Sequence, residues 1–361
     1  MSRFDHIDLY GGIEVRRSSA FPLAADLPRG QHMRAVHITS LDGPESVQIV
    51  DIDEPAVRDD ALVIDVEAAG VAYPDALLTR GLYQYKPELP FVPGSEIAGI
   101  VRSAPEGSGF AAGDRVAALT GLSDGMAEVA VVSPDTVFPL PDAVSLTAGA
   151  GLLFNDLTVH FALRERGRLA EGETVLVHGA AGGIGTSALR LAPVLGASRV
   201  IAVVSTEAKG EIAKAAGATD VVLTADADGT GWKDAVKKLT DGRGVDLVVD
   251  PVGGDRFTDS IRSLAPSGRI LVLGFTGGEI PTVKVNRLLL NNVDVVGVGW
   301  GAWWMTRPGY LATQWAELEP LLASGELTAP EPTVFSIDKA SDAILSLENR
   351  TAAGKVVLQL K

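Results

Sequence analysis

The sequence predicts an α/β protein, with a doubly wound parallel sheet in its C-terminal half and a mostly antiparallel β region before it. From about residue 150, short continuous apolar runs alternate with helical patterns, which is typical of strands buried on both faces between helices. From Met33 to about residue 150, β-rich runs are instead bounded by Asp, Gly or Pro, which is typical of antiparallel strands joined by turns. The 40 glycines among 361 residues fit a fold with many tight turns.

The first part of the chain is divided into an extension and a β-rich region. Residues 1–32 do not share the pattern that follows and are expected to form an N-terminal extension. They contain Arg16 and Arg17, but the apolar stretch behind this pair is shorter than the about 7–15 residues of a secretory signal, so we expect no export. The strands expected after Met33 are residues 34–38, 47–50, 61–66, 96–101, 115–119 and 137–141.

The second part reads as six strands with five crossovers, the pattern of a dinucleotide-binding fold. The expected strands are residues 174–178, 200–204, 221–223, 247–249, 270–273 and 293–298. Helices are expected at 207–216 and 232–239, because Gly217 and Gly242 follow them as C-terminal caps. The chain then returns to mixed helix and strand and ends on an apolar run at 354–360.

Composition excludes several classes of function. Lys and Arg number 31 against 46 Asp and Glu, a net charge of −15, so nucleic acid is not an expected partner. No apolar run approaches the roughly 18 residues of a membrane-spanning helix, so we expect no membrane partner. The absence of cysteine excludes disulfides, thiolate metal sites and cysteine nucleophiles, and it fits a cytoplasmic location.

A glycine loop between the expected strand at 174–178 and a following helix predicts a dinucleotide site. Gly182 and Gly183 let the backbone approach a pyrophosphate, and Gly185 lets helix and strand pack closely. The N–H groups at the start of the helix, together with its dipole, favour an anion there. We therefore predict cofactor contacts along the loop, at Ala181, Gly182, Gly183 and Ile184.

The tip of the second strand indicates which dinucleotide binds. NAD sites usually place an acid about 20 residues past the loop to hold the ribose hydroxyls. Here that place is taken by Ser205 and Thr206, and Lys209 one helical turn later can meet a 2′-phosphate. The sequence therefore favours NADPH over NADH. In the alternative, Glu207 bonds the ribose and Lys209 is a solvated surface lysine.

From Met33 to Lys361 the chain resembles the zinc-independent quinone oxidoreductase branch of the medium-chain dehydrogenase/reductase superfamily. The resemblance rests on the glycine loop and on residues 70–75, 80–83, 90–99, 113–116, 250–254 and 354–358. It implies a GroES-like β-barrel catalytic domain at 33–156 and 302–361, and a Rossmann NADP(H)-binding domain at 157–301. A homodimer is also implied, because the last Rossmann strand of this family pairs across two subunits.

The same resemblance implies that no metal is bound. Zinc-dependent relatives have a cysteine where this chain has Ala72 or Tyr73, and Gly-His-Glu where it has residues 94–96. The five histidines show no ligand spacing, and His178 reads as a core residue at a strand end. Without a metal to polarise an alcohol, the feasible reaction is hydride transfer to an acceptor that is already electrophilic.

The resemblance also assigns site residues. Tyr83 matches a tyrosine that lines the nicotinamide pocket, which makes it the candidate catalytic hydrogen-bond donor or proton source; in the alternative it only packs. Tyr73 is expected to be a pocket wall. The remaining contacts expected near the nicotinamide are Asn155, Thr158, Val252, Gly274, Phe275, Thr276, Val298 and Gly299. Ala72 stands where the family commonly has Asn, which suggests a less polar or roomier acceptor site.

Three tryptophans within five residues, Trp300, Trp303 and Trp304, leave their role open. Trp300 and Trp303 are candidates for an acceptor pocket that takes a planar or apolar substrate, and the same residues suit a subunit interface or the core.

Together these features predict an NADPH-dependent reductase of quinones or activated alkenes. The alternatives are an enoyl-thioester reductase and a catalytically weak NADPH-binding protein of the crystallin type.

Overall fold

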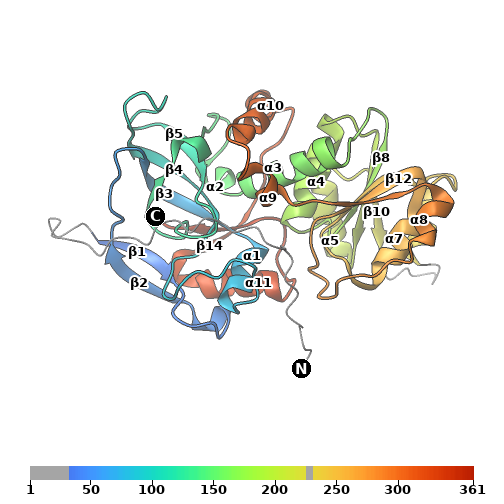
Figure 1. The fold of residues 1–361 in the computed structure, drawn as a ribbon, viewed down its shortest axis with the longest axis horizontal. Helices are drawn as coiled ribbons and strands as arrows, with labels where there is room; N and C mark the ends of the chain where they lie inside the picture. Colours follow the sequence, from blue (N-terminus) through green and yellow to red (C-terminus); the bar gives the residue numbers. More distant parts are fainter. Residues whose placement is uncertain (1–31, 225–230) are drawn as a thin grey trace.

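The computed structural model describes residues 32–224 and 231–361, and Figure 1 shows them as two β-sheet units arranged along the long axis of the molecule. The predicted extension at 1–32 lies outside the described residues except for His32. Within the described part of the chain, no helix is both long and apolar enough to cross a membrane.

The parallel sheet has six strands and confirms the predicted doubly wound fold. It consists of β8 (Thr174–His178), β9 (Arg199–Val204), β10 (Asp220–Leu223), β11 (Val245–Asp250), β12 (Leu264–Val272) and β13 (Asp294–Gly297). Their spatial order is β10-β9-β8-β11-β12-β13, so the direction of winding reverses between β8 and β11. In such sheets ligands bind at this reversal, beyond the carboxyl ends of the strands.

Helices cover both faces of this sheet, which explains the continuous apolar runs of its strands. Successive strand residues point to opposite faces. Val175 and Val177 pack in a core that includes helix α4 (Gly183–Val194), whereas Leu176 packs in a separate core against α6 (Trp232–Leu239) and α7 (Phe257–Ser263). The predicted helix after β9 is α5 (Glu207–Ala215), and the last crossover contains α8 (Asn286–Asn291).

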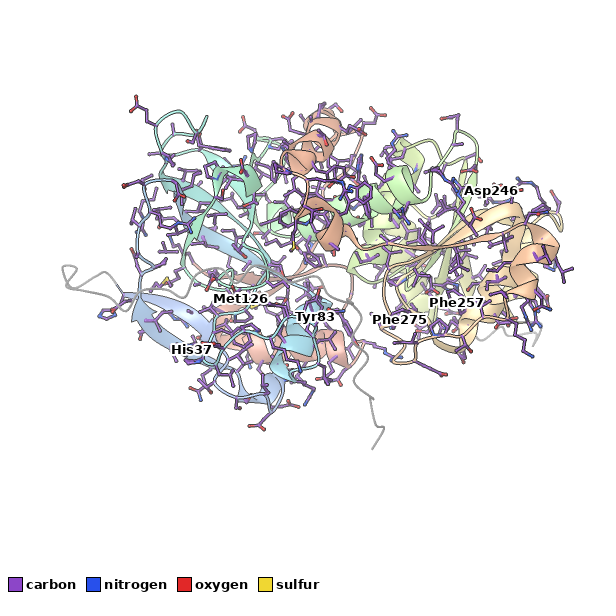
Figure 2. All side chains as sticks on the ribbon, viewed as in Figure 1. His37, Tyr83, Met126, Asp246, Phe257 and Phe275 are labelled. Carbon is purple, nitrogen blue, oxygen red and sulfur yellow. The ribbon has the colours of Figure 1, made fainter. Side chains whose placement is uncertain are left out.

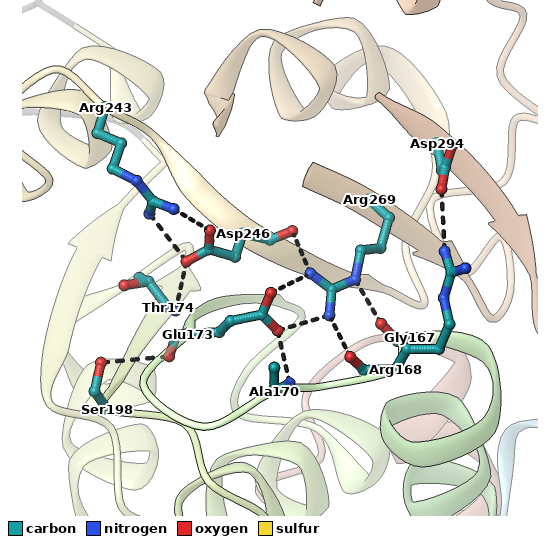
Figure 3. Close-up of polar contacts among 10 residues, drawn as sticks. All are labelled: Gly167, Arg168, Ala170, Glu173, Thr174, Ser198, Arg243, Asp246, Arg269 and Asp294. Atoms are coloured by element: carbon teal, nitrogen blue, oxygen red, sulfur yellow. Dashed lines mark hydrogen bonds and ion pairs between the residues drawn. The ribbon is translucent and has the colours of Figure 1, made fainter. Parts of the chain in front are cut away.

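A buried arginine links the strands at the edge where their amino ends lie, opposite the expected binding edge (Figure 3). Arg269 of β12 is 6% exposed; it makes two 2.6 Å contacts with the carboxylate of Glu173 and donates to the carbonyl of Gly167. Asp246 at the start of β11 accepts from the N–H of Thr174, where β8 begins. These bonds join β8, β11 and β12 at the amino edge of the sheet.

The second unit is a seven-stranded sheet with the order β14-β15-β3-β4-β5-β7, and β6 also pairs with β3. Its strands are β3 (Leu62–Val71), β4 (Glu96–Ser103), β5 (Arg115–Leu119), β6 (Val129–Val132), β7 (Val137–Pro139), β14 (Thr333–Ser336) and β15 (Val356–Gln359). β15 lies antiparallel to β3, so the C-terminal strand completes the N-terminal sheet, as the GroES-like arrangement requires. A separate hairpin is formed by β1 (His32–His37) and β2 (Gln48–Asp53).

Three sequence predictions in this unit were incomplete. β6 and β14 were not predicted, and β3 runs to Val71 instead of ending at residue 66. The added part of β3 contains Ala68, Ala69 and Gly70, which have low strand propensity. Close packing explains it: a Cβ on Gly70 would lie 2.4 Å from the carbonyl oxygen of Ala150.

Six further α-helices lie in the described part of the chain. They are α1 (Tyr73–Thr79), α2 (Leu146–Gly149), α3 (Leu153–Phe161), α9 (Trp300–Trp304), α10 (Tyr310–Ser324) and α11 (Ala340–Glu348). α3 is tied to α4 by the buried carboxylate of Asp156, which contacts Arg190 at 2.5 Å and accepts from Ser187 at 2.6 Å. The predicted domain limits after residues 156 and 301 fall inside α3 and α9, and they stay a prediction.

Candidate active site

The glycine loop lies at the reversal of the parallel sheet, between β8 and α4. Gly179 adopts φ +58°, and the N–H of Gly182 donates to its carbonyl at 2.9 Å. A Cβ on Gly185 would lie 2.2 Å from that same oxygen, so only glycine fits there. The tight turn leaves the start of α4, with its unpaired N–H groups, at the carboxyl edge of the sheet.

Helix α3 brings Asn155 against this loop. A Cβ on Gly183 would lie 2.5 Å from the Asn155 amide nitrogen, so the side chain and the loop backbone are in direct contact. Asn155 is 6% exposed, and Thr158, almost one turn later, is half-buried and donates its hydroxyl to the Phe154 carbonyl at 2.6 Å. Two residues predicted to contact the cofactor therefore lie on one helix that starts beside the glycine loop.

The tip of β9 carries the exposed Ser205 and Thr206. Thr206 caps α5: its hydroxyl oxygen accepts the N–H of Lys209 at 3.3 Å. The Lys209 ammonium donates to the carbonyl of Arg350 at 3.0 Å. The structure thus places a second cationic residue, Arg350, beside the predicted 2′-phosphate contacts. No local pattern could have found it, because 141 positions separate it from Lys209.

The loops after β11, β12 and β13 contain the other predicted nicotinamide contacts. At the end of β11, Asp250 accepts the N–H groups of Val252 and Gly253, both at 2.9 Å. Thr276, in the loop after β12, donates its N–H to the Pro251 carbonyl at 3.1 Å. Gly253 also lies against the ring of Phe275, so the first two loops touch each other.

The rest of the predicted set lies beside these loops. In the loop after β12, the half-buried Gly274 precedes Phe275. Val298 donates its N–H to the Val272 carbonyl at 3.0 Å, and the exposed Gly299 follows it, so the third loop starts beside the end of β12.

Tyr83 lies in the other unit, in the turn that follows α1. Gly81 adopts φ +63°, and the N–H of Leu82 donates to the Leu77 carbonyl at 2.9 Å, which fixes the turn. Tyr83 is half-buried and packs against the cluster of Ile38, Leu78 and Phe91. In Figure 2 Tyr83 lies on the side of its unit that faces the parallel-sheet unit, and Phe275 lies at the facing edge.

Ala72 and Tyr73 begin the segment that leads to Tyr83. Ala72 is 7% exposed, and its N–H donates to the Asp75 carboxylate at 2.7 Å. Tyr73 is the half-buried first residue of α1. The small side chain of Ala72 therefore lies at the N-terminus of α1, and α1 leads into residues 80–83, which we call the tyrosine turn.

Three charged residues that the sequence prediction did not include, Asp75, Glu96 and Lys355, are buried in the antiparallel unit. Lys355 and Glu96 are 3% and 1% exposed, and their Nζ and Oε1 atoms are 2.6 Å apart. The second oxygen of Glu96 accepts the N–H of Phe154 in α3 at 2.9 Å. Gly354, next to Lys355, donates its N–H to the Ala181 carbonyl of the glycine loop at 2.8 Å. Burial raises the pKa of Glu96.

The third buried charge, Asp75, gives a pH prediction. Burial raises its pKa from 3.8 to about 6, although the N–H groups of Ala72 and Gly94 and the charge of Lys355 favour the carboxylate. Between these values the unfolded chain has released a proton that the folded chain retains. Stability should therefore fall as the pH rises from about 4 to about 6, by up to about 3 kcal/mol.

Urea unfolding of the wild type and of Asp75→Asn across this pH range measures the effect. The variant should be less stable throughout, because an amide has only one acceptor oxygen for two N–H donors. It should also lack this component of the pH slope. An unchanged slope in the variant would assign the titration to another group.

The tryptophans predicted for the acceptor pocket make packing contacts. Trp300 is 6% exposed, donates its indole N–H to Gln314 at 2.9 Å, and meets Phe154 edge to face at 5.9 Å. Trp303 packs on Phe161 at 5.4 Å, and the Arg307 guanidinium lies 3.7 Å from its ring centroid. Their role in binding a substrate stays a prediction.

Within residues 32–224 and 231–361, no group of three or more His, Cys, Asp or Glu side chains is placed to hold a metal ion. His178 is fully buried at the end of β8, where its Nε2 lies 2.8 Å from the Ser260 hydroxyl and its ring packs on Trp232. Burial lowers the pKa of His178 to about 4, so it is neutral at physiological pH.

Two family models match this chain. Residues 58–142 match the family model of the alcohol dehydrogenase GroES-like domain, and residues 183–320 match that of the zinc-binding dehydrogenases. Among curated relatives, quinone oxidoreductase-like protein 2 of Rattus norvegicus is 36% identical over 334 residues, which cover 92% of this chain and 94% of that protein.

Solved structures are similar over almost their whole length. A probable oxidoreductase from Mycobacterium abscessus has 43% identity and a TM-score of 0.82, with 91% of this chain and 99% of the other covered. The Escherichia coli quinone oxidoreductase complexed with NADPH has 28% identity and a TM-score of 0.79, with 90% and 99% covered. By its motifs, its fold and these similarities, the chain belongs to the zinc-independent quinone oxidoreductase branch of the medium-chain dehydrogenase/reductase superfamily.

Proposed function

We propose that this protein is an NADPH-dependent oxidoreductase that transfers a hydride to a quinone or to an α,β-unsaturated carbonyl compound. The proposal rests on the groups that gather at the carboxyl edge of the parallel sheet, where its winding reverses. There the glycine loop lies in contact with Asn155 and receives the backbone of Gly354, while Lys209 stands at the acid-free tip of β9. The NADPH complex of the Escherichia coli relative supports this assignment.

The residues present fit an NADPH molecule. The N–H groups at the start of α4, within Ala181–Ile184, would hold the pyrophosphate, since the first N–H groups of a helix have no partner in the helix itself. Ser205, Thr206, Lys209 and Arg350 would hold the 2′-phosphate. Thr158 and the loops after β11, β12 and β13 would hold the nicotinamide. The bound cofactor supplies the hydride.

The acceptor would lie between the nicotinamide and the tyrosine turn. Tyr83 would donate a hydrogen bond from its hydroxyl to the acceptor carbonyl oxygen and stabilise the negative charge that develops there. Tyr73 and Ala72 would form the wall next to it, and Ala72 makes this wall less polar than the Asn of typical relatives. Trp300 and Trp303 are the proposed apolar side of the pocket.

Lys209 gives the sharpest test of the cofactor. Lys209→Ala should weaken NADPH binding by about tenfold, because a charged hydrogen bond to phosphate is lost, while NADH binding should change less than about twofold. Nucleotide fluorescence titration measures both. Lys214→Ala is the control, because Lys214 lies on the same helix but pairs with Glu211. Equal weakening of both cofactors, or wild-type binding of NADH as tight as that of NADPH, would contradict the proposal.

The acceptor class is tested by NADPH consumption with 1,4-benzoquinone, a simple enone and a crotonyl thioester. Preference for the quinone or enone supports the proposal, whereas preference for the thioester indicates an enoyl-thioester reductase. The net charge of −15 disfavours thioester carriers, which contain phosphate groups. Binding of NADPH without turnover of any acceptor would indicate a crystallin-like binding protein.

We also propose a cytoplasmic homodimer joined through β13. This strand forms one edge of the parallel sheet, with Val295 37% exposed. Leu289 and Leu290 of the neighbouring α8 are each 75% exposed. An exposed apolar edge strand can pair with the same strand of a second copy around a two-fold axis. Light scattering tests the dimer, and a monomer mass at working concentration would contradict it.

A further inference from the structure

One short segment of the chain touches the proposed cofactor site at both ends. This C-terminal strap, residues 349–355, joins α11 to β15. Near its start the carbonyl of Arg350 accepts from the Lys209 ammonium at 3.0 Å, and near its end the N–H of Gly354 donates to Ala181 at 2.8 Å. The strap therefore spans from the proposed 2′-phosphate contacts to the glycine loop.

The strap is held in an unusual backbone conformation. Arg350 adopts φ +57° although it is not a glycine, and Gly354 adopts φ +66°. A non-glycine residue in the left-handed region carries a cost, and it persists where its surroundings fix it. Here the carbonyl turned toward Lys209 belongs to the strained residue itself.

The residue just before the strap, Glu348, forms an ion pair with Arg80 of the tyrosine turn. Glu348, the last residue of α11, contacts Arg80 through both oxygens, at 2.5 Å to Nε and 2.9 Å to Nη2. Both side chains are about one-third exposed. The guanidinium also donates to the Asp42 carbonyl at 3.3 Å, and a Cβ on Gly43 would overlap it, so Arg80 is packed as well as paired. The hydrogen bond to Glu348 raises the pKa of Arg80.

These contacts make a short path between two separate parts of the proposed site. Lys209 touches Arg350, which lies two residues after Glu348, and Glu348 holds Arg80 three residues before Tyr83. An ammonium has three donors, so Lys209 can keep its bond to the strap while it binds a phosphate. Binding of the 2′-phosphate would then restrict Lys209, the strap and the helix end together.

We infer that Arg80 and Glu348 are positioning residues that couple the 2′-phosphate site to Tyr83, so that a bound 2′-phosphate orders the tyrosine turn. The inference rests on the proposed NADPH function and deepens it. In this proposal the 2′-phosphate contributes to the affinity of the cofactor and also helps to hold Tyr83 in its catalytic position. Coupling of this kind is reciprocal, because each site stabilises the conformation that the other requires.

The test uses a ligand that cannot reach Tyr83. 2′,5′-ADP carries the adenosine and the 2′-phosphate but no nicotinamide, and 5′-AMP differs from it by lacking the 2′-phosphate. Hydrogen exchange is followed at residues 77–85, where the N–H of Leu82 is bonded to Leu77. Saturating 2′,5′-ADP should slow exchange there about fivefold, the lower end of usual coupling between sites, and 5′-AMP should not.

Glu348→Gln and Arg80→Met should abolish this protection while 2′,5′-ADP still binds; two variants are used in case one does not fold. The control is Arg102→Met, because Arg102 is matched to Arg80. Arg102 is 34% exposed and pairs with Glu54 at 2.7 Å and Asp65 at 2.8 Å, whereas Arg80 is 33% exposed and pairs with Glu348 and, at 3.4 Å, with Glu45. Arg102 lies outside the path, so its replacement should leave the protection intact.

Protection that survives in both Glu348→Gln and Arg80→Met, or equal protection by 5′-AMP, would overturn the inference. If 2′,5′-ADP binds without protecting residues 77–85, the coupling fails while the NADPH assignment stands. If 2′,5′-ADP does not bind, the NADPH assignment fails and the inference fails with it. Binding is measured separately by calorimetry, so these two failures are distinguishable.

Discussion

Tyr83→Phe should lower kcat by about 10- to 150-fold and leave NADPH affinity nearly unchanged. One hydrogen bond to a developing oxyanion is worth about 1.5–3 kcal/mol, which corresponds to that range of rates. The ring itself packs against Ile38, Leu78 and Phe91, and phenylalanine keeps these contacts. Steady-state kinetics and a nucleotide titration measure the two quantities.

The loss should be larger for an enone than for a quinone. The carbon of an enone must still be protonated after hydride transfer, whereas water readily protonates the oxyanions of a reduced quinone. Tyr85→Phe is the matched control, because Tyr85 lies two residues further along the same loop and is 47% exposed. Small, equal effects of Tyr83→Phe on both acceptors, below about threefold, would leave Tyr83 as a wall residue.

Local patterns in the sequence predicted the parallel sheet and the glycine loop well. The strands β8, β9 and β11 are buried on both faces, so their residues form continuous apolar runs, and such a run is visible without knowledge of its neighbours. Gly185 is required by a contact with the carbonyl of Gly179, only six residues earlier in the chain. The helix at 232–239 also lies where its pattern and its glycine cap placed it.

Contacts between distant segments were not predictable in this way. β14 has only four residues, too few for a periodic pattern to predict it, and it is a strand because β15 lies beside it. Arg350 and Lys355 likewise join the site only because β15 returns to the sheet begun by β3. A sequence pattern records the spacing of neighbours along a chain, whereas these residues are neighbours only in the folded protein.

The acidic residue Glu96 shows how much such a contact changes the interpretation of one position. In the sequence it is only the last residue of a motif that lacks the histidine of zinc enzymes. In the structure it is an anchor between the units, since it bonds Lys355 of the C-terminal strap and the first turn of α3. Its oxygens are therefore engaged by groups of this chain.

This pair should make a large contribution to stability that depends on both partners. Lys355→Met leaves the carboxylate of Glu96 buried without a counter-ion, and breaking a buried pair in this way costs about 3–5 kcal/mol. The double variant Glu96→Gln with Lys355→Met removes both charges, and the glutamine oxygen can still accept the N–H of Phe154. It should recover most of the loss, because the penalty comes mainly from an unpaired charge.

Denaturant unfolding of the single and double variants measures this coupling, and Lys361→Met provides the control. Lys361 contacts Asp65 at 3.0 Å, but these side chains are 40% and 32% exposed, so its loss should cost less than about 1 kcal/mol. Equal losses for Lys355→Met and Lys361→Met would mean that water reaches Glu96. A double variant as unstable as Lys355→Met alone would instead mean that the loss does not come from an unpaired charge on Glu96. Recovery of stability in the double variant would therefore show that Lys355 stabilises the fold mainly by neutralising the buried charge of Glu96.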